Sequence, residues 1–151
     1  MAIWTAPPGP RELEMALARV QPEEVILFVH DPGLDATSTL LPQLAGLVKY
    51  ALRTRAGQID LDAAAARLAH RAGTVMAGLE CLAAQGMVYI VERQPDTWQL
   101  AAGTGESNPH ALEQTRARLD ALLAETAAYR AYVRTAPTTA LLNHCLPSAA
   151  N

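Results

Sequence analysis

The chain has 151 residues, of which 50% are apolar and 18% are charged. This is the composition of a folded globular protein with one or two small domains, and it excludes the intrinsically disordered class. The 12 Lys and Arg side chains against 15 Asp and Glu give a net charge of −3, which argues against a protein that coats DNA without sequence preference. Cys81 and Cys145 have no metal-binding spacing, and no signal segment or membrane-spanning apolar run occurs, so we expect a cytoplasmic protein.

The first 36 residues predict a small β-α-β fragment. A short strand is expected over residues 2–6, and a helix over 11–20, where apolar residues recur at helical spacing. Residues 24–30, with the sequence EVILFVH, form a nearly continuous apolar run, which is typical of a strand covered on both faces. One helix and one weak strand supply too little surface to cover it. This fragment is therefore expected to need a neighbour, either from the rest of the chain or from residues upstream.

Residues 37–103 predict a winged helix-turn-helix domain. Apolar residues recur at helical spacing in three segments, and glycines follow the first and the third. Asp60 and Thr74 are the expected N-caps of the second and third helices. The three helices are expected over residues 40–55, 61–70 and 75–85.

A short β-hairpin is expected to follow the third helix. Residues 87–91 have the alternation of a strand, residues 94–96 make the turn, and Trp98 lies on the return strand. Trp98 is expected to anchor the hairpin to the core. If either is exposed, Tyr89 or Trp98 is the side chain expected to stack on nucleic-acid bases.

Residues 104–136 predict a loop followed by a long C-terminal helix over about residues 109–134. Its apolar side chains recur every three or four residues in a narrow seam, which suits packing on the winged core or on a second copy of the chain. Two threonines in the seam weaken a free coiled coil, so packing within the chain is favoured over a homodimer through the 109–134 helix. Residues 137–151 lack periodicity and are expected to be a disordered tail. The expected fold class is α+β and mostly helical.

The sequence contains no catalytic constellation. His30 and Asp31 lack the convergent carboxylates and histidines of a metal site, and His70 is expected to interact with the C-terminal dipole of its helix. No Gly-x-Ser-x-Gly motif and no glycine-rich phosphate loop occurs. We therefore expect no enzymatic activity and no cofactor in this chain alone.

The helix that would enter the major groove of DNA, residues 75–85, carries no Lys or Arg. Its outward positions are expected to be Met76, Ala77, Glu80, Ala83 and Ala84. Only Gln85, at its far end, belongs to the residue types that read bases. The side chains predicted to contact phosphates or an acidic peptide lie elsewhere and are Arg53, Arg55, Arg67, Arg71 and Arg93. The alternative is that these arginines form only a solvated helix surface.

Several stretches together carry a family resemblance. An aromatic residue and two prolines precede a short acidic helix, an apolar strand leads to an acidic-proline loop, and a helix beginning Thr-Val runs into the hairpin. The stretches are residues 3–8 (IWTAPP), 11–14 (RELE), 25–28 (VILF), 60–61 (DL), 74–86 and 125–130 (ETAAYR). In this order they resemble the C-terminal region of bacterial RecJ-type single-stranded-DNA exonucleases, over roughly residues 1–136.

The resemblance implies a role in DNA repair or recombination. The family's 5'-3' exonuclease activity uses a divalent metal such as Mn or Mg in a DHH-type core, whose Asp and His ligands would lie upstream of this region. No Asp-His-His motif occurs here, so the chain is expected to be a non-catalytic accessory domain. In the family such regions contact the DNA path or dock partners, notably the acidic tail of single-stranded-DNA-binding protein. We expect protein docking with a secondary contact to single-stranded DNA. The alternative is a dimeric winged-helix transcription regulator.

Overall fold

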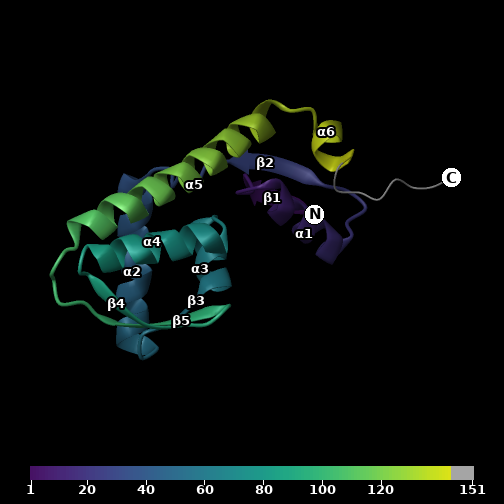
Figure 1. Ribbon diagram of the computed structural model, residues 1–151. Coiled ribbons are helices and arrows are strands. Elements are labelled where there is room, and N and C mark those ends of the chain that lie inside the picture. The colour runs from purple at the N-terminus through teal and green to yellow at the C-terminus, as the bar shows by residue number, and fades with distance from the viewer. Residues whose placement is uncertain (144–151) are drawn as a thin grey trace. The chain divides into compact units, whose positions relative to one another are not determined.

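The computed structural model describes residues 1–143 and divides into two compact units (Figure 1). The terminal unit consists of Met1–Pro32 and Glu125–Asn151, and the central unit consists of Gly33–Ala124. Both contain helices and a small sheet, so the predicted α+β, mainly helical class is confirmed. The division differs from the four consecutive segments expected from the sequence, because the N-terminal fragment groups with the end of the chain and the long helix is shared by both units.

The central unit is built from helices and a three-stranded antiparallel sheet with the strand order β3-β5-β4. Its elements are α2 (Thr37–Thr54), β3 (Gln58–Asp60), α3 (Leu61–Leu68), α4 (Ala72–Ala84), β4 (Val88–Arg93), β5 (Thr97–Ala102) and the first part of α5 (Pro109–Thr135). Strand β3 is absent from the sequence-based prediction. Its three residues pair with β5, from Gln58 opposite Gln99 to Asp60 opposite Thr97.

The start of α3 confirms one predicted cap, and the start of α4 corrects another. Asp60 accepts a hydrogen bond at its Oδ1 from the backbone N of Ala63, 2.7 Å away, and so caps α3. Helix α4 begins at Ala72 with Arg71 as its N-cap, so the prediction that Thr74 caps this helix is wrong. The backbone N of Thr74 already donates to the Arg71 carbonyl at 3.0 Å, which places Thr74 inside the first turn.

Helix α4 forms the centre of the core in the central unit. None of its thirteen residues is exposed, because α2 and α3 pack on it and α5 runs alongside it (Figure 1). This burial matches its sequence, which is apolar nearly all round and not only along one stripe. Leu119 and Leu123 of α5 are buried in the same core, so this part of the long helix packs within the chain, as expected.

The terminal unit contains a two-stranded parallel sheet and three helical segments. Its elements are β1 (Ala2–Thr5), α1 (Pro10–Val20), β2 (Ile26–His30), the end of α5, and α6 (Thr138–Asn143). Leu13 and Leu17 of α1 are buried. Arg130 of α5 is fully buried, and its Nε donates to the Ala6 carbonyl at 3.2 Å.

Two sequence-based expectations fail in the terminal unit. Strand β2 is not covered on both faces, since Phe28 is 53% exposed and its ring lies 4.7 Å from that of the exposed Trp4. The sheet has only two strands, and their outer aromatic side chains cover one another rather than a core. The predicted tail over 137–151 contains helix α6, with Leu141 buried, and its remaining part, 144–151, lies outside the described residues.

Candidate functional site

A groove opens in the central unit between α2, β3 and α3, with a volume of about 620 Å³. Its apolar lining comes from all three elements and from the segment before α2, and consists of Leu34, Leu47, Ala51, Ile59, Ala63, Ala64 and Leu68. Polar side chains surround this lining, and they are Gln43, Tyr50, Arg55, Gln58, Asp60 and Arg67. The volume lies within the range of pockets that bind small molecules or side-chain anchors of peptides.

Two of the predicted arginines meet at this groove. Arg55 is the C-cap of α2, and Arg67 lies in the last turn of α3, and both are exposed. A cationic side chain is favourable at a helix C-terminus because it faces the negative end of the helix dipole. The Arg55 guanidinium carbon also lies 6.0 Å from the centre of the Tyr50 ring, at the outer limit of a cation–π contact.

The local charge around the groove is opposite in sign to that of the whole chain. Residues 37–68 carry four basic and two acidic side chains, a net charge of +2, whereas the chain carries −3. One of the two acids, Asp60, is held by its hydrogen bond to the N-terminus of α3. The groove therefore combines an apolar lining with a positive rim and suits a ligand that is both acidic and apolar.

The structure does not bring the other three predicted arginines to this groove. Arg53 is exposed on α2 outside the lining, and Arg71 is half-buried at the start of α4. Arg93, on β4, lies 3.4 Å from Glu80 and 4.9 Å over the ring of Trp98. Trp98 is only 4% exposed, which confirms that it anchors the hairpin to the core.

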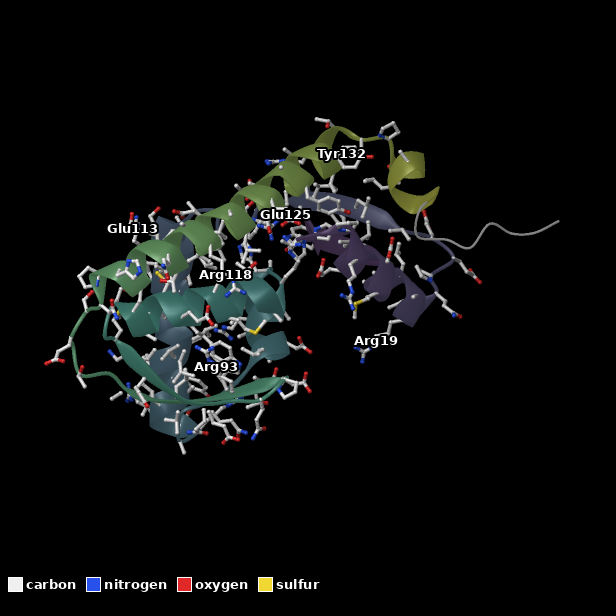
Figure 2. All side chains as sticks on the ribbon, in the orientation of Figure 1. Arg19, Arg93, Glu113, Arg118, Glu125 and Tyr132 are labelled. Carbon is white, nitrogen blue, oxygen red and sulfur yellow. The ribbon has the colours of Figure 1, made fainter. Side chains whose placement is uncertain are left out.

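Glu80 of α4 joins the hairpin to the long helix. Its two carboxylate oxygens lie 3.4 Å from Arg93 of β4 and 3.0 Å from Arg118 of α5. Figure 2 labels both arginines. Sequence reasoning assigned Glu80 to an outward face of α4, but its side chain is largely covered and ion-paired. The sequence does not reveal this position of Glu80, because its partner Arg118 lies on α5 and no local pattern connects the two residues.

Replacing Glu80 with Gln is expected to lower the free energy of unfolding by about 1 kcal/mol, because two partly exposed ion pairs are lost. Urea denaturation at low salt measures this loss. At high salt the loss should shrink, since screening already weakens the pairs. The matched control is Glu113→Gln on the exposed side of α5, for which no change is expected. An equal effect of both substitutions would contradict the assigned role of Glu80.

The expected outer face of α4 is corrected by the structure. Ala77 and Ala84 are buried, and Met76, Glu80 and Ala83 are half-buried. Helix α5 contributes to this burial, because Arg118 pairs with Glu80, and the segment before α5 contributes through the backbone N of Asn108, which donates to the Ala84 carbonyl. None of the five positions expected to face outward is therefore exposed.

The histidines and acids singled out in the sequence have structural contacts. The Nε2 of the buried His70 lies 3.0 Å from the Leu34 carbonyl and 3.5 Å from Asp35, so it ties the end of α3 to the segment before α2. Asp31 forms an ion pair with Arg134 at 3.2 Å. Within residues 1–143, no three His, Cys, Asp or Glu side chains lie together as metal ligands would.

A scan against protein-family models and searches of curated proteins and of solved structures found no match to this chain. No helix among the described residues is both long and apolar enough to cross a membrane.

Proposed function

We propose that the chain is a non-catalytic docking module whose central unit has a winged-helix fold. The order of helix, short strand, two helices and β-hairpin supports this assignment, as does the antiparallel sheet β3-β5-β4. The groove between α2, β3 and α3 binds an acidic segment of a partner protein. An apolar side chain of that segment enters the groove, and its carboxylates bind Arg55 and Arg67.

The observation that carries this proposal is the pairing of two exposed guanidinium groups with one apolar groove. A guanidinium binds a carboxylate through two parallel hydrogen bonds, and Arg does this better than Lys because its donors are planar. The apolar lining supplies a contact that a bare phosphate chain would not fill. An acidic peptide with an apolar anchor uses both features, which is how helix or peptide grooves commonly obtain specificity.

The setting that we propose is a RecJ-like single-stranded-DNA exonuclease in DNA repair or recombination. There the module docks the acidic tail of single-stranded-DNA-binding protein, with single-stranded DNA as a secondary ligand. The ordered stretches from residues 3–8 to 125–130 support this setting, and the acid-binding groove is consistent with it. Helix α4 is largely covered and carries no Lys or Arg, which favours docking over a dimeric transcription regulator that reads duplex DNA.

The test is fluorescence anisotropy with a short labelled peptide that is rich in Asp and ends in Phe. The double substitution Arg55→Glu/Arg67→Glu is expected to weaken binding by at least roughly a hundredfold, since each charged hydrogen-bonded contact contributes about 1.5–3 kcal/mol. Replacing the terminal Phe of the peptide with Ala should also weaken binding, because the apolar lining then lacks its anchor.

The matched control is Arg11→Glu/Arg19→Glu on the exposed side of α1, which changes the net charge equally (Figure 2). This variant should bind the peptide nearly as well as the unchanged protein. Equal losses in the two double variants would mean that only overall charge matters and would reject the groove. A labelled single-stranded oligonucleotide, titrated at low and at moderate salt, measures the secondary contact.

A further inference from the structure

The outer edge of the three-stranded sheet is unpaired, and only its far end, with the register shift and the charged Glu92 and Arg93, carries the usual protection of an edge strand. Strand β4 pairs with β5 on one side, and no strand pairs with its other side among residues 1–143. Proteins usually protect such an edge with Lys, Pro or inward charges. Here residues 87–91 read Met-Val-Tyr-Ile-Val and contain none of these. Met87, Tyr89 and Val91 are 53%, 64% and 55% exposed.

The hydrogen bonds of the hairpin show which backbone groups point outward. The backbone N of Gly103 donates to the Met87 carbonyl at 3.2 Å. In an antiparallel ladder, successive residues direct their N–H and C=O alternately toward and away from the neighbouring strand. The C=O of Met87 and both backbone groups of Tyr89 are therefore directed toward β5, whereas those of Val88 and Ile90 are directed toward the open edge. The Met87 N–H donates to the Leu82 carbonyl. The register shift between Ile90 and Glu92 ends this regular segment.

We propose that a second copy of this chain occupies the edge, with the two β4 strands antiparallel about a two-fold axis at Tyr89. In this register Val88 of one copy faces Ile90 of the other, so the outward backbone groups of both residues form reciprocal hydrogen bonds. The two sheets then become one continuous sheet across the axis.

The side chains of the segment fit a self-pairing better than a foreign strand. The types of residue on the two sides of Tyr89 are similar. Val88 and Ile90 are both β-branched, and positions 87 and 91 are both apolar. On the exposed face the two Tyr89 rings meet at the axis. Aromatic and β-branched pairs of this kind stabilise antiparallel sheets. A two-fold axis requires such self-complementarity, and this register opposes no like charges.

The pairing can be tested by disulfide trapping at the axis. Directly opposite residues of a non-hydrogen-bonded pair have Cα atoms about 4.5 Å apart, which suits a disulfide. In a Cys145→Ser background, Tyr89→Cys is expected to give a covalent dimer on mild oxidation. Cys81 does not interfere, because it is fully buried and burial raises the pKa of its thiol.

The matched control is Val91→Cys, which is similarly exposed but lies off the axis. In the proposed register the two copies of position 91 are separated by roughly 13 Å along the strands, so Val91→Cys alone should not cross-link. Equal cross-linking at positions 89 and 91 would overturn the register.

Sedimentation velocity over a range of concentrations measures the association itself. The unchanged protein is expected to show a monomer–dimer equilibrium, and Tyr89→Lys to weaken it by roughly tenfold, because two like charges then meet at the axis. Thr97→Lys, on the same sheet face but on β5, should leave it unchanged. A monomer at every concentration would overturn the proposal. The Arg55→Glu/Arg67→Glu variant should still dimerise, so this test is independent of the groove.

Discussion

Leu119→Ala is expected to lower the free energy of unfolding of the central unit by about 2–5 kcal/mol, the usual cost of truncating a fully buried leucine. Leu119 has 0% exposure and packs in the core that α4 occupies. The side chain lies on the part of α5 that belongs to the central unit. A large loss would therefore show that α5 is an integral part of this core and covers α4 in solution.

Fluorescence of Trp98 during urea denaturation reports this loss. Trp98 is buried in the central unit, and the exposed Trp4 can be replaced by Phe so that Trp98 is the only indole. The control is Glu113→Ala on the exposed side of the same helix, for which a change within about 0.5 kcal/mol is expected. Similar small effects at Leu119 and Glu113 would mean that α5 leaves the core, and would reopen the duplex-reading interpretation of α4.

Local patterns were sufficient for the helices and the hairpin of the central unit. Asp60 was identified as an N-cap from its residue type and position, and Trp98 as a buried anchor from its place on the return strand. The spacing of apolar residues located the long helix to within a residue of its observed ends. These features depend on neighbours close in sequence, so the sequence contains the information directly.

Strand β3 and the cover over α4 depend on partners distant in sequence. The three residues of β3 are too few to show an alternation, and only pairing with β5 makes them a strand. The sequence of helix α4 is apolar nearly all round, which indicates a helix buried on every side. Assigning it an outer face followed the expected DNA-binding arrangement rather than its own residues.

The sequence predicted the arginines of the candidate groove but not its apolar lining. Five arginines were singled out, but residue type and spacing do not separate Arg55 and Arg67, which share the groove, from Arg93, which pairs with Glu80. That distinction is set by how α2 and α3 pack across the short strand β3. The apolar lining was likewise assigned to the core, because a groove wall and a core residue have the same hydrophobicity.

Gly57→Ala is expected to destabilise the central unit by at least about 2 kcal/mol, because an L-residue in the left-handed region already costs roughly 1–2 kcal/mol. Gly57 has φ +86°, and an added Cβ would lie 2.0 Å from the backbone O of Leu100. The Gly57 carbonyl also accepts a hydrogen bond from the Leu100 backbone N at 2.9 Å. Relieving the clash would therefore move β3 away from β5.

Because β3 lines the groove, Gly57→Ala should also weaken binding of the acidic peptide. Urea denaturation measures the loss of stability, and fluorescence anisotropy measures the loss of peptide affinity. The control is Gly73→Ala in the first turn of α4, which lies outside the groove and where an added Cβ meets no atom within 4 Å. Alanine is the better helix former, so this change should stabilise the protein by about 0.5–1 kcal/mol. Effects of the same sign at both glycines would contradict the close approach of α2's end to β5, and with it the position of β3 in the groove wall.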